Sequence, residues 1–244
     1  MKAMIFAAGL GTRLRPLTDT LPKALVPVGG KPLLYHVLMK LKAAGITEFV
    51  INVHHFADKI VSYLGENDNF GLDISISDET GGLLETGGGI LHARDYLDGQ
   101  FLVHNVDILS NLDVAAFAGN ARPEAMATLL VSERTTSRYL LFDDDMRLKG
   151  WTNVSTGEVR SPYPDLDPAS CRRLAFSGIH LVSGEIFDAF GKYGFSGRFP
   201  IMDFYLKACR ERPVFGAVQP GLRLMDVGKA ETLAKAEEFI KTVL

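Results

Sequence analysis

The fold is decided by residues 3–16, Ala3-Met-Ile-Phe-Ala-Ala-Gly-Leu-Gly-Thr-Arg-Leu-Arg-Pro16. The first six of these residues form a short apolar run that stops at a glycine, as a buried parallel strand does. The glycines that follow let backbone N–H groups approach an anion closely, and the two arginines add planar forks that match phosphate oxygens. The sequence therefore predicts a strand that runs directly into a phosphate-binding loop.

Two other kinds of phosphate-binding loop are disfavoured. The dinucleotide-binding fingerprint needs a third glycine where this chain has Leu14, and Pro16 interrupts the helix that would begin there. The Walker pattern is absent. Lys23 follows closely and adds a compact positive charge. A plain turn around Gly9-Leu-Gly11 is the remaining alternative, and the nearby basic residues weigh against it.

Alternating strand and helix patterns continue through the first half of the chain. In order, the predicted elements are a helix over 32–44 that Gly45 ends, a strand over 49–53, a helix over 56–64, a strand over 72–77, a helix over about 90–97 and a strand over 101–109. This order predicts a Rossmann-like α/β fold, a mostly parallel mixed sheet flanked by helices. Ligands on such sheets bind outside the carboxyl ends of the strands.

The rhythm changes after about residue 135. The predicted elements are strands over 139–142, 148–151 and 176–182, a polar excursion over 153–173 that crosses the active-site face, and helices over 184–190, 201–212 and 230–243. We find no internal repeat and no hexapeptide repeat. Residues 1–244 are therefore expected to form a single domain.

Composition and charge exclude several classes of partner. Of the 244 residues 47% are hydrophobic and 23% charged, an ordinary balance for a globular protein. A net charge of −3 gives no overall attraction to nucleic acid or to membranes. Cys171 and Cys209 lack metal-ligand spacing, and no stretch approaches the roughly 20 apolar residues that cross a bilayer. The first apolar run is too short for a signal peptide, so a cytoplasmic location is expected.

Two aspartates stand where metal ligands are expected. Asp107 ends the apolar run Val103-His-Asn-Val, and Asp226 lies just ahead of the last predicted helix. Mg²⁺ binds one or two protein carboxylates together with substrate phosphates and water. Two aspartates at strand ends on one face would supply these ligands. For Asp107 alone, the alternative is a cap on the next helix.

The loop Gly9-Leu-Gly-Thr-Arg13, followed by Pro22-Lys23, resembles that of the sugar-1-phosphate nucleotidyltransferase family. The resemblance runs across nearly the whole chain and is strongest in the first 110 residues. It implies a glycosyltransferase-A-like nucleotidyltransferase fold and Mg²⁺-dependent transfer of a nucleotidyl group from a nucleoside triphosphate to a sugar 1-phosphate, with release of pyrophosphate. It also implies a nucleotide-binding half over about 1–135 and a sugar-binding half over about 136–244.

The resemblance further implies three sets of site residues. The catalytic residues are Arg13, Lys23, Asp107 and Asp226, of which the two aspartates bind the metal. The nucleotide-binding residues are Ala8, Gly9, Gly11, Thr12, Arg13, Lys23, Asp78, Glu79 and Gly87. The sugar-binding residues are Glu85, Asn105, Trp151, Asn153, Ser177 and Gly178.

Two segments, Glu85-Thr-Gly-Gly-Gly89 and Phe176-Ser-Gly-Ile179, look most like the N-acetylmuramate-1-phosphate uridylyltransferase branch, which serves cell-wall recycling. This implies UTP and N-acetylmuramate 1-phosphate as substrates. The chain departs from the family at Val106, where glycine is usual, and it lacks the usual sugar-holding Glu-Lys pair. The lactyl carboxylate of muramate needs a cation, for which the candidates are Arg138, Arg172, Arg173 and Arg198.

Other functions stay open at this point. Within the reaction class, the alternatives are a guanylyl- or cytidylyltransferase for mannose or heptose 1-phosphate or for phosphocholine. Outside it, the alternative is a non-catalytic nucleotide-sugar sensor, which would not need all four catalytic residues. A histidine metal site is disfavoured, because adjacent His54 and His55 would face opposite sides of a strand. Either a monomer or a small homo-oligomer is expected.

Overall fold

The central sheet is built around β1 (Lys2–Phe6), the strand at the start of the deciding stretch. In the computed structural model, which describes residues 1–243, β1 pairs in parallel with β4 (Glu48–Val53) on one side and with β6 (Gln100–Asn105) on the other. Beyond β4, β5 (Asp73–Asp78) also pairs in parallel. The carboxyl ends of these four strands therefore meet at one edge of the sheet, as the sequence predicted.

The long strand β12 (Arg172–Ser183) joins this parallel part to a smaller antiparallel part. Its second half pairs antiparallel with β6 and with β8 (Ala127–Ser132), and its first residues pair with β9 (Arg138–Phe142). The remaining strands of the sheet are β10 (Leu148–Asn153), β11 (Glu158–Arg160) and β13 (Val214–Ala217). The main path is β11-β10-β9-β12-β6-β1-β4-β5, with β8 and β13 branching from β12.

Two short ladders and the helices complete the described residues. The ladders pair β7 (Ile108–Ser110) with β14 (Leu224–Asp226), and β2 (Pro27–Val28) with β3 (Lys31–Pro32). The α-helices are α1 (Leu33–Ala43), α2 (Ala57–Glu66), α3 (Glu85–His92), α4 (Val114–Gly119), α5 (Ile186–Lys192), α6 (Ile201–Ala208) and α7 (Ala230–Val243). Short 3-10 turns cover Thr12–Leu14, Leu17–Asp19, Lys23–Leu25, Asp68–Gly71 and Arg94–Tyr96.

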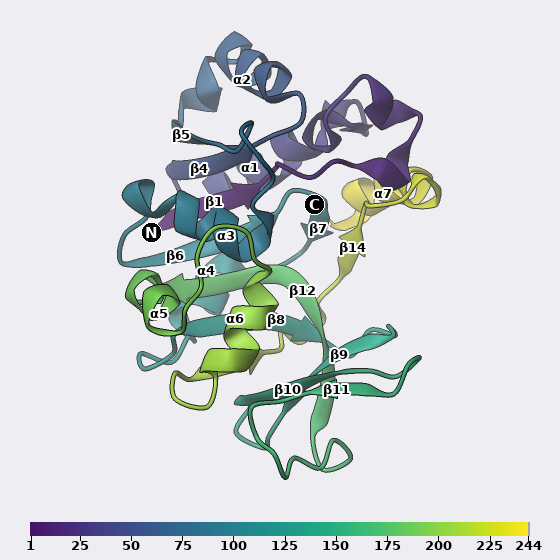
Figure 1. The fold of residues 1–244 in the computed structure, drawn as a ribbon. Helices are drawn as coiled ribbons and strands as arrows, with labels where there is room; N and C mark the ends of the chain where they lie inside the picture. Colours follow the sequence, from purple (N-terminus) through teal and green to yellow (C-terminus); the bar gives the residue numbers. More distant parts are fainter. Residues whose placement is uncertain (244) are drawn as a thin grey trace.

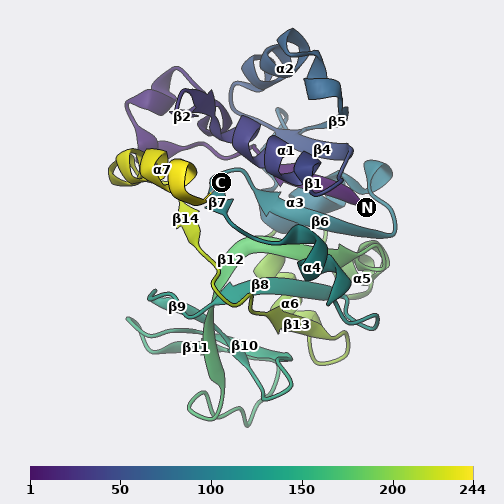
Figure 2. The same ribbon diagram turned by 180° about the vertical axis from the view of Figure 1, so that it is seen from behind.

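Helices cover both faces of the sheet and bury two separate cores. Helices α3, α5 and α6 lie in front of the sheet in Figure 1, where Phe190 and Tyr205 are fully buried. Helices α1, α4 and α7 cover the other face, seen from behind in Figure 2, where Leu34 and Ala236 are buried. This two-sided cover is what the β-α-β-α order predicted, so the Rossmann-like α/β fold class is confirmed. None of the helices within residues 1–243 has the length and apolarity needed to span a bilayer.

Several predicted elements differ from the observed ones. The helix predicted over about 90–97 instead begins at Glu85 and ends at His92, and its three glycines allow close contact with neighbouring segments. The strand predicted over 101–109 breaks into β6 and β7 at a turn that contains Asp107. The polar stretch 153–173 does not cross the cavity described below. It contains β11, which pairs with β10 at the sheet edge, and the loop after β11 lies at the bottom of Figure 1.

Candidate active site

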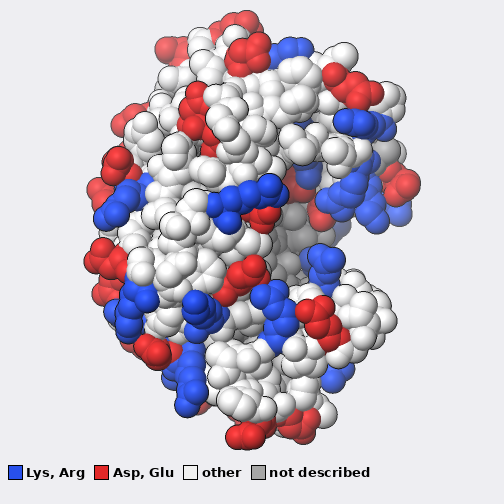
Figure 3. Space-filling view, viewed as in Figure 1, with Lys and Arg blue, Asp and Glu red and all other residues white. Residues whose placement is uncertain are grey.

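A cavity of about 350 Å³ lies at the carboxyl ends of the parallel strands. Its walls come from the ends of β1, β4 and β6, from the segments that follow β1, β5 and β6, and from the start of α3. The lining residues are Phe6, Ala8, Gly9, Lys23, Asn52, Glu79, Leu83, Glu85, Thr86, Asn105, Val106 and Asp107. In Figure 3 the surface is deeply hollowed at the right-hand edge, above the part that carries β9–β11, and Lys and Arg side chains stand on both rims. The positive charges on the rims would therefore attract an anionic ligand.

The loop after β1 provides the floor on which an anion can lie. Gly11 has φ +64, and a Cβ there would lie 2.8 Å from Cγ2 of Thr18, so glycine is required. The Thr18 hydroxyl donates to the carbonyl oxygen of Gly11 at 2.8 Å and holds the loop closed. Ala8 and Gly9 line the cavity as predicted. Thr12 is exposed and outside the lining in this structure.

Lys23 and Asp107 form an ion pair inside the cavity. Their side chains are 13% and 14% exposed, so water screens the pair only partly. Asp107 is no helix cap, because α4 is capped by Asp113, whose carboxylate accepts from the N–H of Ala116 at 2.9 Å. The helix-cap alternative for Asp107 is therefore wrong.

The second aspartate is brought beside the first by the ladder of β7 and β14. Asp226 pairs with Ile108, and the N–H of Val227 donates to the carbonyl oxygen of Asp107 at 2.8 Å. A Cβ on Gly228 would lie 2.6 Å from Oδ1 of Asp226 and 2.8 Å from Nη2 of Arg13. The missing side chain of Gly228 thus lets the Asp226 carboxylate and the Arg13 guanidinium come close to the same backbone.

These groups fit a magnesium ion. Two carboxylates on adjacent strands are the hard oxygen donors that Mg²⁺ takes, with substrate phosphates and water completing the shell. The Lys23 ion pair involves Oδ2 of Asp107, which leaves Oδ1 as a donor. Within residues 1–243 no group of three or more His, Cys, Asp or Glu side chains is arranged to hold a metal. An ion here would therefore depend on the substrate for most of its ligands.

A buried hydrogen-bond network that the sequence analysis missed joins two cavity loops. Oδ1 of Asn52 accepts from the N–H groups of Ala7 and Ala8 at 2.7 and 3.3 Å, and Nδ2 donates to Oε1 of Glu79 at 2.7 Å. Oε2 of Glu79 accepts from the N–H of Leu84 at 3.1 Å. Asn52 and Glu79 are almost completely buried. The available signal was a single polar residue inside the apolar run 49–53.

The glycine-rich segment has a packing role. Gly87 donates its N–H to the carbonyl oxygen of Phe199 at 2.9 Å, and a Cβ on it would lie 2.2 Å from the Phe199 ring. Its N–H is therefore unavailable to a nucleotide, and the assignment of Gly87 to nucleotide binding is corrected. Gly89 lets Glu79 approach, since a Cβ there would lie 2.8 Å from Oε1 of Glu79.

Asp78 also lies outside the cavity, unlike its neighbour Glu79. Side chains alternate along β5, so Ser77 is buried and Asp78 is exposed. The Asp78 carboxylate accepts from the N–H of Thr80 at 2.7 Å, and hydrogen bonding to Thr80 lowers the pKa of Asp78 below its usual range. Asp78 thus shapes the turn after β5, and its predicted role in reading the base stays a prediction.

Glu85 lines the cavity in a backbone conformation that is unusual for a non-glycine residue, with φ +62. Its carboxylate pairs with Arg198 at 2.8 Å. Next to it, the Thr86 hydroxyl accepts from the N–H of Ile201 at 2.9 Å. Strained residues held by their surroundings gather at functional sites. These contacts tie the start of α3 to the start of α6.

The predicted sugar-binding residues divide into two groups. Asn105 lines the cavity, and Gly178, with φ +73, packs so closely that a Cβ would lie 2.7 Å from Nδ2 of Asn105. Ser177 is 1% exposed, and its Oγ has no hydrogen-bond partner within residues 1–243. Trp151 and Asn153 do not line the cavity.

Their positions on β10 explain why. Asn153 closes the hairpin that leads to β11, where its Oδ1 accepts from the N–H of Ser155 at 3.1 Å. Trp151 packs against the core under α6, with the Arg160 guanidinium 6.0 Å from its ring centroid. Both contribute to the small antiparallel part, and their predicted contact with the sugar stays a prediction.

The buried histidines do not serve as acids or bases near neutral pH. Burial lowers the pKa of His104 to about 4 and that of His180 to about 3. Nδ1 of His104 bonds the carbonyl of Asn105 at 2.8 Å, and Nδ1 of His180 bonds the hydroxyl of Tyr205 at 2.8 Å. Both are neutral core residues with a hydrogen-bond partner.

The chain is similar to a known protein family over nearly its whole length. Residues 2–243 match the family described as nucleotidyl transferase. The chain belongs to the nucleotidyl transferase family. It is 38% identical to the N-acetylmuramate alpha-1-phosphate uridylyltransferase of Neisseria meningitidis over 241 residues, which cover 97% of each chain. It is 37% identical to the enzyme of the same name from Caulobacter vibrioides, covering 96% of this chain and 95% of that one.

A solved structure of a family member shows the same fold. A putative glucose-1-phosphate thymidylyltransferase from Bacillus anthracis superimposes with a TM-score of 0.81 at 20% identity, covering 100% of this chain and 96% of that one. The family predicted from the sequence, sugar-1-phosphate nucleotidyltransferases, is therefore confirmed. As a member of this family, the chain is an enzyme that transfers nucleotidyl groups to sugar 1-phosphates.

Proposed function

We propose that this nucleotidyl transferase joins UTP to N-acetylmuramate 1-phosphate, in a magnesium-dependent reaction that releases pyrophosphate. The observation that carries the reaction is the convergence of Lys23, Asp107 and the glycine loop in one cavity at the strand ends. The choice of substrates is supported by the two uridylyltransferases that match over nearly their full length.

The reaction needs an oxygen nucleophile and a leaving group but no enzyme nucleophile. A phosphate oxygen of the sugar 1-phosphate attacks the α-phosphorus in line, and the bond from that phosphorus to the pyrophosphate oxygen breaks. The attacking phosphate is already an anion near neutral pH, so no general base is required. Positioning and charge stabilisation supply the catalysis. Lys23 and Arg13 are proposed to stabilise the charge on the attacked and leaving phosphates.

Asp107 and Asp226 are the proposed magnesium ligands. The bound ion would neutralise charge on the phosphates that react. The ion pair with Lys23 fixes the position of the Asp107 carboxylate in the cavity. The close approach permitted at Gly228 keeps Arg13 and Asp226 near each other without an ion pair between them.

The loop after β5 is proposed to face the base. Both oxygens of Glu79 accept hydrogen bonds from inside the protein, one from Asn52 and one from the N–H of Leu84. Glu79 therefore orders the loop over 80–84, and the backbone of this loop together with Leu83, which lines the cavity, would contact the base. Backbone groups that hydrogen-bond one base edge discriminate against bases that lack the matching groups.

The two halves of the chain are proposed to divide the work. Residues 1–135 contribute the phosphate loop and the base-side loop, and residues 136–244 contribute Gly178 beside the sugar and Asp226 beside the metal. A cytoplasmic location, and a monomer or small homo-oligomer, remain predictions.

The substrate assignment is tested by pyrophosphate release over a grid of substrates. UTP, GTP, CTP and dTTP are each combined with the 1-phosphates of N-acetylmuramate, N-acetylglucosamine, glucose and mannose. We expect the highest kcat/KM for UTP with N-acetylmuramate 1-phosphate. A preference for GTP with mannose 1-phosphate would contradict the substrates but leave the reaction class in place. No turnover with any pair would favour a nucleotide-sugar sensor.

The metal assignment is tested separately with Asp107→Ala and Asp226→Ala. Each variant should lose at least about 10-fold in turnover at saturating Mg²⁺, which is about 1.4 kcal/mol of barrier stabilisation, while its circular dichroism spectrum stays that of the parent. Both variants should also bind Mn²⁺ more weakly in the presence of UTP, as measured by the paramagnetic effect of the ion on water relaxation. A folded variant that keeps wild-type turnover and Mn²⁺ affinity would remove that aspartate from the metal site.

A further inference from the structure

The loop after β8 faces the same end of the sheet as the cavity. β6 and β8 each pair antiparallel with β12, so they run in the same direction. Their carboxyl ends therefore point to one edge, and residues 133–137 continue from β8 at that edge. This loop carries Arg134, a residue that the sequence analysis did not single out.

Arg134 is held beside the sugar-side residues by a backbone contact. Its Nη2 donates to the carbonyl oxygen of Phe176 at 3.0 Å. Phe176 lies two residues before Gly178, in the part of β12 where its pairing with β8 is irregular. Gly178 packs against Asn105, which lines the cavity. Between them, the hydroxyl of Ser177 is buried and lacks a partner within the described residues.

The charge of Arg134 is not compensated. No carboxylate lies within 4 Å of its guanidinium among residues 1–243. The neutral carbonyl that it contacts fixes the side chain without cancelling its charge, and the side chain is exposed. A planar guanidinium whose remaining N–H groups are free is suited to bind a carboxylate in a two-pronged manner.

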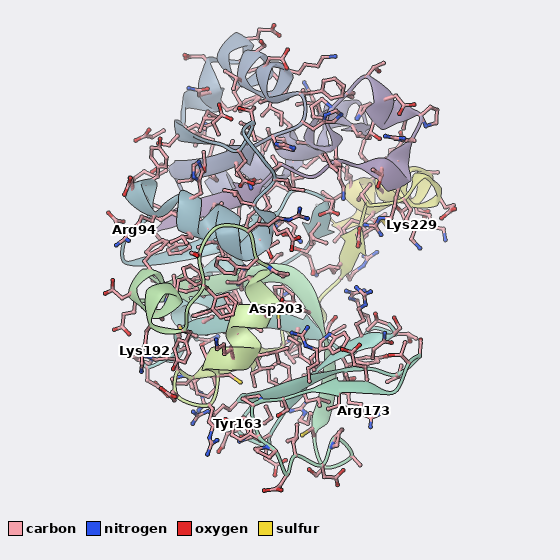
Figure 4. All side chains as sticks on the ribbon, viewed as in Figure 1. Arg94, Tyr163, Arg173, Lys192, Asp203 and Lys229 are labelled. Carbon is pink, nitrogen blue, oxygen red and sulfur yellow. The ribbon has the colours of Figure 1, made fainter. Side chains whose placement is uncertain are left out.

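The other candidate arginines are less suited to this role. Arg198 is already paired with Glu85 at 2.8 Å, so a substrate carboxylate would have to compete with a protein carboxylate. Arg172 and Arg173 pair with β9 at the start of β12, and Figure 4 shows Arg173 at the lower right, on the small antiparallel part. Arg138 opens β9 opposite Asn153. Neither Arg134 nor Arg138 lines the cavity itself, but among the described residues only Arg134 of these two has a guanidinium hydrogen bond to β12.

We propose that Arg134 is the specificity residue that binds an acidic substituent on the sugar. The proposal rests on the proposed function, because N-acetylmuramate differs from N-acetylglucosamine by a lactyl ether that ends in a carboxylate. A charge-assisted hydrogen bond to that carboxylate is strong enough to select between the two sugars, whereas the phosphate-binding residues treat them alike.

The test compares three sugar 1-phosphates, each with UTP: N-acetylmuramate 1-phosphate, its lactyl methyl ester and N-acetylglucosamine 1-phosphate. The ester keeps the shape of the substituent and removes its charge. For the wild type, kcat/KM should fall on the order of 10- to 100-fold from acid to ester. Arg134→Ala should lose the same factor on the acid, mostly through KM, and change less than about 3-fold on the ester and on N-acetylglucosamine 1-phosphate.

The matched control is Arg138→Ala, which removes an exposed arginine four residues further along the chain. It should keep the wild-type ratio of acid to ester. Equal losses on acid and ester in Arg134→Ala would assign Arg134 a structural role and overturn the proposal. The proposal would also be overturned if Arg138→Ala lost the preference for the acid over the ester while Arg134→Ala kept it. A wild type that does not use N-acetylmuramate 1-phosphate would instead refute the proposed substrate, a result distinct from either.

Discussion

Replacing Asn52 by Asp would place two carboxylates against each other in the buried network. The Asn52 amide donates to Oε1 of Glu79 at 2.7 Å, and a carboxylate in its place has no hydrogen to donate. The aspartate can still accept from the N–H groups of Ala7 and Ala8, because it has the same shape. Two charges at that distance repel by about 6 kcal/mol at an effective dielectric constant of about 20. Holding one carboxyl protonated at pH 7 against an ordinary pKa of about 4 costs only about 4 kcal/mol. The variant should therefore take up a proton.

This proton uptake gives the stability of Asn52→Asp a defined pH dependence. The pair in the folded variant would have a pKa raised above the unfolded value, so the variant matches the wild type most closely at low pH and loses stability as pH rises. Relative to wild type, the free energy of unfolding should be lower by about 1.4 kcal/mol at pH 5 and by about 4 kcal/mol at pH 7. Urea unfolding followed by circular dichroism at both pH values measures the difference.

A second substitution separates charge repulsion from simple loss of packing. In Asn52→Asp with Glu79→Gln, the glutamine amide donates to the new carboxylate, and its oxygen still accepts from the N–H of Leu84. This double variant should regain most of the stability at pH 7 and lose the pH dependence. A pH-independent loss in the single variant, or no recovery in the double one, would refute the reasoning.

Three further predictions follow from contacts in the site and the cores. Lys23→Ala should lower kcat on the order of 10²–10³-fold with little change in nucleotide affinity, because the charge on the attacked and leaving phosphates grows in the transition state. A defect confined to KM in steady-state kinetics would contradict this. Gly87→Ala should lower the free energy of unfolding in urea by about 3 kcal/mol or more, because the added methyl group clashes with Phe199. The control is Gly65→Ala in α2, where a Cβ meets nothing within 4 Å, and this variant should not be destabilised. Burial lowers the pKa of His180 to about 3, so between about pH 6 and 4 the unfolded chain binds a proton that the folded chain does not. As pH falls over this range, the free energy of unfolding of the wild type should decrease by about 1.4 kcal/mol per pH unit more than that of His180→Phe. Identical pH slopes of the two proteins in chemical unfolding would disprove this.

The sequence predicted the elements whose signals are local. Residues 33–43 form α1 because apolar side chains recur at helical spacing, and Gly45, with φ +85, ends it as expected. The last helix, Ala230–Val243, was predicted with its observed bounds. The glycine loop and Lys23 reach the cavity as predicted, since a parallel strand must place the residues that follow it at the carboxyl edge.

Features that depend on distant partners were not predictable in this way. The strand β8 was missed because its pairing partners, β12 and β13, lie more than 40 residues away in the sequence. Gly87 looks like a ligand-binding glycine by sequence, and only the position of Phe199 reveals that packing excludes a side chain. Asn52 carries no motif, and its role appears only when Ala7, Ala8 and Glu79 surround it.

The ladder of β7 and β14 has a consequence for biosynthesis. Asp107 and Asp226 are neighbours in space, but the ribosome makes the second one long after the first. A nascent chain can therefore bury its β1 core and assemble its glycine loop while it still lacks half of its carboxylate pair. If Asp226 completes the magnesium site, as proposed, such a chain would turn over at least about 10-fold more slowly until β14 docks. Activity measured during cell-free synthesis would then report when this three-residue strand docks.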